Sequence, residues 1–111
     1  MKKIENIESY TIDIESVAYH CLSKFEINNV GTLLVLKKST VIGTITDGDI
    51  RKALINNRLL SIPIRIIMKS DYKFGRDEHE CREIFNLYPF IFMVPLIGDN
   101  RELIDIYIRD I

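Results

Sequence analysis

The stretch Val41-Ile42-Gly43-Thr44-Ile45-Thr46-Asp47-Gly48-Asp49-Ile50 is the most informative part of this 111-residue chain. Its first six residues are mostly β-branched, which favours a strand. The residues after Asp47 place apolar side chains at helical spacing, and Thr46 or Asp47 can cap the start of that helix. The stretch therefore predicts a strand over 41–46 that runs directly into a helix over 47–56.

The residues before this stretch complete a βαββα unit. Residues 10–12 are β-prone, and Ser16 is a suitable N-cap for a helix that ends near Asn28. The continuous apolar run 32–36 is typical of a strand covered on both faces, and 41–46 is expected to be its antiparallel hairpin partner.

The apolar pattern of this unit repeats further along the chain. Tyr10 falls on Tyr72, 62 positions later, and the same spacing places Leu34 on Leu96 and Ile45 on Tyr107 without a gap. The second unit then predicts strands over 71–74, 90–97 and 102–108 and a helix over 77–88.

The repeat predicts an α/β (α+β) module of two tandem βαββα units packed as one domain. We assign residues 1–60 to the first repeat and 61–111 to the second, joined by the short connector 59–63. The last helix of the second repeat is truncated, because the chain reaches Ile111 where the first repeat has reached only Asp49. We therefore expect this chain to be a piece of a longer polypeptide.

Composition excludes several classes of protein. The 15 basic and 16 acidic residues give a net charge of -1, which offers no general attraction for nucleic acid or an anionic membrane. No apolar run is long enough to cross a bilayer, and the first residues lack a signal-peptide core, so we expect a cytoplasmic protein. Two cysteines and two histidines in no recurring ligand spacing predict reduced thiols and no metal site.

The junction of strand and helix at Thr46 can hold a nucleoside phosphate. The first N–H groups of a helix lack partners within the helix and attract anions, and the Thr46 hydroxyl adds a donor. Asp49, one turn later, would repel phosphate but suits a ribose diol. The alternative is a capping box, in which Thr46 and Asp49 satisfy only the helix's own backbone. By spacing alone, the capping role is favoured.

The two βαββα units and the Gly-x-x-Thr-x-x-Asp pattern of Gly43, Thr46 and Asp49 resemble a cystathionine β-synthase (CBS) domain pair. The resemblance extends to the run Ile62-Pro63-Ile64-Arg65-Ile66-Ile67-Met68, which leads into the second repeat. It implies a pseudo-twofold module that binds an adenosine nucleotide or S-adenosylmethionine, with Thr46 near phosphate and Asp49 on ribose. On this resemblance, the ligand-binding role of these residues is favoured over the capping role.

The resemblance implies one good ligand site and no catalytic residue. The ligand-binding residues would be Gly43, Thr46, Asp47, Asp49 and Arg51, with an adenine pocket completed by Val94 and Pro95. For the side chain of Val94, ordinary core packing is the favoured alternative. In the second repeat Thr46 falls on Ile108 and Asp49 on Ile111, so the matching site should lack both polar groups.

The expected function is regulatory, with no cofactor other than the adenosine nucleotide as a possible ligand. Residues 48–54 and 102–107 resemble the CBS pair found ahead of bacterial sugar-phosphate nucleotidyltransferases, which implies a fused effector domain beyond Ile111. The apolar runs 90–94 and 104–108 favour a homodimer. The alternative is a structural dimerisation module with a vestigial cleft. An enzyme that uses Asp47 and Asp49 as acid and base is least favoured, because no third group supports them.

Overall fold

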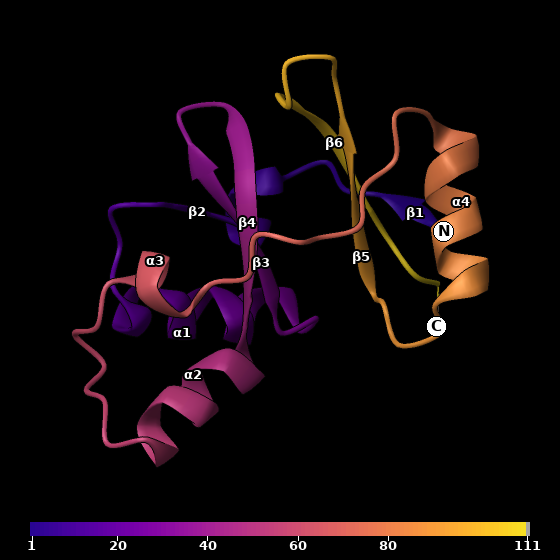
Figure 1. Ribbon diagram of the computed structural model, residues 1–111. Coiled ribbons are helices and arrows are strands. Elements are labelled where there is room, and N and C mark those ends of the chain that lie inside the picture. Colours follow the sequence, from indigo (N-terminus) through magenta and orange to yellow (C-terminus); the bar gives the residue numbers. More distant parts are fainter. Residues whose placement is uncertain (111) are drawn as a thin grey trace.

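The computed structural model describes residues 1–110 and consists of two small sheets with helices on their outer faces (Figure 1). The first sheet has the strand order β2-β3-β4 and the second has the order β1-β6-β5. The elements are β1 (Lys2–Lys3), the 3-10 helix η1 (Ile7–Tyr10), β2 (Thr11–Asp13), α1 (Ala18–Asn28), β3 (Thr32–Lys37), β4 (Thr40–Thr46), α2 (Asp47–Ile55), α3 (Ile64–Ile67), α4 (Glu78–Leu87), β5 (Met93–Ile97) and β6 (Leu103–Ile108).

Alternation of apolar side chains along the strands divides the core into three layers. Leu34 and Ile106 belong to the middle layer, in which the two sheets face each other. Leu33, Val35 and Ile45 point to the opposite face of the first sheet and pack with residues of α1, α2 and α3. A third cluster fills the space between the second sheet and α4 (Figure 1).

Most elements of the first repeat lie where the sequence predicts them. The strand over 41–46, its hairpin partner and the helix that starts at Asp47 are confirmed, and β3 is buried along its central residues. The helix predicted over 77–88 is also confirmed as α4. These segments have either a clear helical period or a continuous β-branched run, and both patterns agree with the local capping residues.

Two strand predictions in the second repeat need correction. Residues 71–74 form no strand: Tyr72 and Phe74 both pack toward the core between the sheets, and the Tyr72 hydroxyl donates to the carbonyl of Val41 at 2.7 Å. The next residue, Gly75, forms an isolated bridge to Leu96. The strand predicted over 90–97 begins at Met93, and Phe90 lies almost fully exposed before it.

The prediction of one constant spacing of 62 positions between the two repeats was also wrong. Cys21 and Cys81, 60 positions apart, are the fully buried thiols of α1 and α4. The pair Val35–Gly43 before the bulge of the first hairpin corresponds to Leu96–Asp105 in the second, so the spacing is 61 for the first strand and 62 for the second. Leu34 therefore does not correspond to Leu96, which faces α4.

Each sheet gains an edge contact from a segment that leads into the other repeat. The second sheet is extended by β1, which leads into the first repeat, and the first sheet is contacted by Lys69, which leads into the second repeat. Strand β1, which the sequence did not predict, pairs with β6, and the Ile4 N–H donates to the carbonyl of Ile106 at 2.8 Å. In the first sheet, Lys69 and Thr44 exchange two backbone hydrogen bonds of 2.8 and 2.9 Å. These crossed contacts cover one edge of each hairpin and bind the two repeats together.

Candidate functional site

The corner between β4 and α2 forms a complete capping box. The Asp49 N–H donates to Thr46 Oγ1 at 3.0 Å, and the Thr46 N–H donates to Asp49 Oδ2 at 2.9 Å. Thr46 has extended backbone angles and is the N-cap residue of α2. Two first-turn backbone donors are thus satisfied by these two side chains.

Asp49 is held by a third group, from the segment that follows α3. Its side chain is 8% exposed, and Oδ1 lies 3.3 Å from Nζ of Lys69. The carboxylate therefore has a partner on each oxygen. Since Lys69 also bonds to β4 through its backbone, Asp49 connects the start of α2 to the segment that enters the second repeat.

Three other predicted ligand-binding residues, Gly43, Asp47 and Arg51, have contacts of a different kind. A Cβ at Gly43 would lie 2.6 Å from the carbonyl oxygen of Lys69, so glycine allows the close approach of the two backbones. Asp47 and Arg51 form an ion pair of 3.1 Å along the exposed side of α2. Arg51 reaches back to the first turn, where its guanidinium would lie 3.6 Å from a Cβ at Gly48.

A cleft of about 260 Å³ lies between the repeats, and both Thr46 and Pro95 line it. The sequence predicted that these two residues form opposite walls of one site, and the structure brings them together. The cleft is lined by Thr32, Leu34, Thr44, Thr46, Asp71, Tyr72, Lys73, Phe90, Ile91, Phe92, Met93 and Pro95.

Of the seven predicted ligand-binding residues, Thr46 and Pro95 line this cleft, and the other five do not: Gly43, Asp47, Asp49, Arg51 and Val94. Val94 is fully buried in the cluster under α4, because neighbouring residues of a strand point to opposite faces. Its environment is that of an ordinary core residue. Asp49 lines a different cavity, so its carboxylate and the Thr46 hydroxyl lie on two sides of the same corner.

The second repeat has no polar counterpart of Thr46. Strand pairing places Thr32 opposite Thr46 and Met93 opposite Ile108, so Ile108 occupies the equivalent position. It packs against the core between the sheets. The counterpart expected for Asp49, Ile111, lies outside the described residues.

Sequence reasoning missed most of the residues that line the cleft. Thr32, Thr44 and Thr46 present a row of hydroxyl groups on one wall, since Thr32 pairs with Thr46 across the hairpin and Thr44 is two residues away. The alternation of threonines in 44–46 could have signalled this row. Asp71 and Lys73 come from the segment first predicted as a strand, so their position depends on tertiary packing.

The aromatic wall of the cleft is held by Arg109. Its guanidinium donates to the carbonyls of Ile91, Phe85 and Tyr88 at 2.8 to 2.9 Å. These bonds fix the loop between α4 and β5, which carries Phe90 and Phe92. Phe90 is 89% exposed and Phe92 is 49% exposed, so both rings are accessible beside the cleft.

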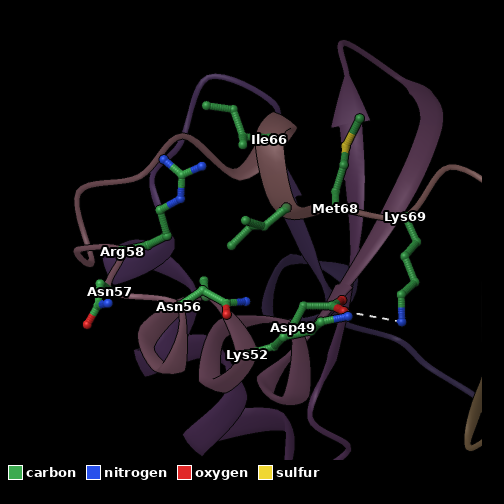
Figure 2. Close-up of a pocket in the computed structure, with 10 residues that line it drawn as sticks. Asp49, Lys52, Asn56, Asn57, Arg58, Ile66, Met68 and Lys69 are labelled. Atoms are coloured by element: carbon green, nitrogen blue, oxygen red, sulfur yellow. Dashed lines mark ion pairs between the residues drawn. The ribbon is translucent and has the colours of Figure 1, made fainter.

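A second and larger cavity, of about 720 Å³, lies between α2 and α3, and we call it the α2–α3 groove (Figure 2). Figure 2 shows Arg58 at one end of the groove and the Asp49–Lys69 ion pair at the other. The groove is lined by Asp49, Lys52, Ala53, Asn56, Asn57, Arg58, Ile66, Ile67, Met68 and Lys69.

Within residues 1–110, no three side chains of His, Cys, Asp or Glu come together as a set of metal ligands. In the same part of the chain, every helix is too short or too polar to span a bilayer.

Comparisons with known proteins give the fold. No protein-family model matches the sequence. No curated protein matches it either. The structure is similar to that of the CbpB protein of Listeria monocytogenes in complex with c-di-AMP, with a TM-score of 0.78, 17% identity and coverage of 97% of this chain and 86% of that chain.

Two other solved structures support the same assignment. A CBS domain protein from Pyrobaculum aerophilum complexed with AMP has a TM-score of 0.71 and 17% identity, over 95% of this chain and 87% of that chain. OpuCA of Staphylococcus aureus has a TM-score of 0.69 and 19% identity, over 98% of this chain and 87% of that chain. The chain therefore has the α+β fold of the CBS domain proteins, with two repeats packed around a shared core.

Proposed function

We propose that this chain is a regulatory module that binds an adenosine nucleotide in the cleft between its two repeats. The observation that carries the proposal is the composition of the cleft, which joins a row of threonine hydroxyls from one repeat to an aromatic and proline wall from the other. The structural neighbours complexed with AMP and c-di-AMP support this ligand class.

The geometry of the cap leaves Thr46 able to bind phosphate. A hydroxyl has one donor and two acceptor sites, and Thr46 Oγ1 uses an acceptor site for the Asp49 N–H. Its own proton can therefore be donated to a phosphate oxygen in the cleft. The positive end of the α2 dipole favours the same charge.

The other walls suit a base and a sugar. Pro95, Phe90 and Phe92 offer apolar or aromatic surface against which an adenine can stack. Asp71 also lines the cleft, and its carboxylate can accept hydrogen bonds from ribose hydroxyls. Asp49, which the family pattern assigns to ribose, lines the other cavity, and its two oxygens are taken by Lys69 and by the backbone of Thr46.

A bound nucleotide would act by shifting the equilibrium between different arrangements of the two repeats. It would contact residues of both repeats, and it would favour the arrangement in which the two walls are correctly spaced. We further propose that this change is passed to an effector domain in a longer polypeptide, with a sugar-phosphate nucleotidyltransferase as the specific candidate. Catalysis would then belong to the effector.

A structural dimerisation module is the second candidate, and one observation favours it. Thr46 and Asp49 already satisfy each other and the first turn of α2, as a purely structural cap requires. Exposed apolar side chains on α1, α2, α4 and the loop after α4 could pack against a second copy; they include Ile27, Ile55, Leu87 and Phe90.

Isothermal titration calorimetry separates the two candidates. AMP, ATP and S-adenosylmethionine should be titrated into the wild-type chain and into the Thr46→Val variant. If the proposal holds, at least one ligand binds, and its affinity falls about tenfold or more in Thr46→Val, because a hydrogen bond to a charged group is lost.

Matched controls make the result specific. Thr40→Val changes a threonine of the same strand outside the cleft and should bind the ligand as wild type does. Asp49→Ala tests whether the carboxylate contacts the ligand or only stabilises α2. Failure of all three ligands to bind the wild-type chain, together with a dimer by light scattering, would favour the structural candidate.

A further inference from the structure

Two cations that are not paired in the described part of the chain line the α2–α3 groove, Arg58 at the end away from the Asp49–Lys69 pair and Lys52 nearer that pair (Figure 2). Arg58 and Lys52 both line it, and within residues 1–110 neither side chain makes an ion pair or a hydrogen bond. The guanidinium of Arg58 extends along the opening toward Ile66 in Figure 2. Side chains of this kind, free and facing one cavity, are suited to an anion.

The carboxylate in the groove does not cancel this charge. Asp49 is largely buried, and its two oxygens are occupied by Lys69 and by the backbone N–H of Thr46. Lys69 offsets its charge, so Lys52 and Arg58 give the groove a net positive character. Asn56 adds amide donors between these two cations.

The opposite wall is apolar. Ile66, which is 57% exposed, and Met68 come from α3 and its C-terminal cap, and both line the groove. The volume of about 720 Å³ is in the range of small-molecule sites, roughly 300–1,000 Å³. An occupant that matches both walls would have an anionic group and an organic part that covers exposed apolar surface.

We propose that the α2–α3 groove is a second ligand site, which takes a phosphate-bearing organic molecule. Arg58 and Lys52 bind phosphate groups at two places along the groove, with Asn56 between them as a neutral donor, while the exposed Ile66 contacts the organic part. The site is separate from the cleft, because the two cavities share no lining residue. It does not depend on the cleft binding a nucleotide.

The two sites meet at one structural element. Asp49 lies in the wall of the groove and bonds to the backbone of Thr46, and the side chain of Thr46 lies in the wall of the cleft. A phosphate that attracts Lys69 away from Asp49 would weaken the ion pair that holds this corner. Occupancy of the groove is therefore expected to change affinity in the cleft.

Nuclear magnetic resonance of the ¹⁵N-labelled full chain tests the proposal with two probes, tripolyphosphate and ATP. Tripolyphosphate should shift the backbone amides of residues 52–58 and 66–69. The double variant Lys52→Gln/Arg58→Gln should weaken this binding about tenfold or more, because charge-assisted hydrogen bonds are lost. The matched double variant Lys37→Gln/Lys38→Gln removes the same charge from the β3–β4 hairpin and should bind as wild type does.

The second probe tests the apolar wall. ATP should bind the groove more tightly than tripolyphosphate, and Ile66→Ser should remove that difference. The variant Phe92→Ala, which alters the cleft on the side of the second repeat, should leave the groove shifts in place, which distinguishes this site from the proposed nucleotide cleft. The proposal is overturned if tripolyphosphate shifts no amides in 52–58 and 66–69, if the two double variants bind equally, or if ATP and tripolyphosphate bind the groove with equal affinity.

Discussion

The ends of the two hairpins have the same backbone arrangement but opposite chemistry. In the first repeat, β4 ends at Thr46, whose hydroxyl caps α2 and lines the cleft. In the second repeat, the equivalent residue on β6 is Ile108, which packs into the core between the sheets. The two corners thus share a backbone arrangement, but within residues 1–110 the first carries a hydroxyl that can donate to an anion and the second an apolar side chain.

The edges of the hairpins differ in a related way. At the bulge of the first hairpin stands Gly43, and the backbone of Lys69 approaches it closely. At the same place in the second hairpin stands Asp105, which carries a side chain. The glycine is therefore explained by the crossing segment of the first repeat rather than by the hairpin itself.

The largest expected effect on stability comes from adding a side chain at the close contact between Gly43 and the backbone of Lys69. Gly43→Ala places a methyl group 2.6 Å from a backbone carbonyl, which cannot move away without breaking the Thr44–Lys69 bonds. We expect the free energy of unfolding in urea to fall by about 2–3 kcal/mol.

Gly48→Ala is the matched control. A Cβ at Gly48 would lie 3.5 Å from Thr46 Oγ1, an ordinary contact, and alanine favours a helix. Its stability should equal or slightly exceed that of the wild-type chain. Equal stability of Gly43→Ala and Gly48→Ala would contradict the close approach of β4 and Lys69.

The two repeats agree in one feature, a fully buried thiol in the first long helix of each repeat. Burial raises the pKa of Cys21 and of Cys81 from the ordinary value of 9.0 to about 11. The unfolded chain releases these protons first, so the stabilisation is fully present below pH 9 and is lost as the pH rises toward 11. The free energy of unfolding should fall by about 1 kcal/mol per thiol at pH 10.

Urea unfolding at pH 8 and pH 10 measures this loss. The double variant Cys21→Ala/Cys81→Ala is the control, since it retains the other groups that ionise at high pH. The free energy of unfolding of this double variant should decline less between pH 8 and pH 10 than that of the wild-type chain. If the free energy of unfolding declines equally in the wild-type chain and in the double variant, the thiols do not remain protonated in the folded chain.

The loops that follow α1 and α4 give the smallest expected effect. In the first repeat, the buried Asn28 bonds to the backbone of Ser9, Val30 and Gly31 and so fixes its loop. In the second repeat, Arg109 holds the loop that carries Phe90 and Phe92. Arg109→Ala should weaken AMP binding about fivefold by calorimetry, since the aromatic wall becomes mobile.

Comparison with Asn28→Ala isolates that effect. Both substitutions should lower the melting temperature, but Asn28 does not line the cleft and reaches it only through a 3.2 Å bond to the carbonyl of Thr32, so its loss should lower AMP affinity less than Arg109→Ala does. If the two variants lose the same affinity, the role of Arg109 is general stability rather than support of the cleft.

Local patterns were sufficient for most of the fold. The helical period after Asp47, the β-branched run before it and the capping pair Thr46 and Asp49 all predict the same structure, and the structure contains it. The equivalence of Thr46 and Ile108 was also predictable, because the spacing of 62 holds for the second strand of each hairpin.

Features that depend on tertiary contacts could not be predicted in this way. Strand β1 exists only because β6 offers it an edge, and Lys2–Lys3 carry no apolar signal of their own. The segment 71–74 has the composition of a strand, but Tyr72 and Phe74 are used for packing instead. The division of Thr46 and Asp49 between two cavities depends on where the connector crosses β4, and the sequence does not encode that position locally.

The most direct test of the account is a crystal structure of the chain grown with AMP. We predict electron density for the nucleotide in the cleft, with the adenine against Pro95 and Phe92 and a phosphate oxygen within hydrogen-bond distance of Thr46 Oγ1. A cleft that stays empty at saturating AMP, or density for AMP only in the α2–α3 groove, would contradict it.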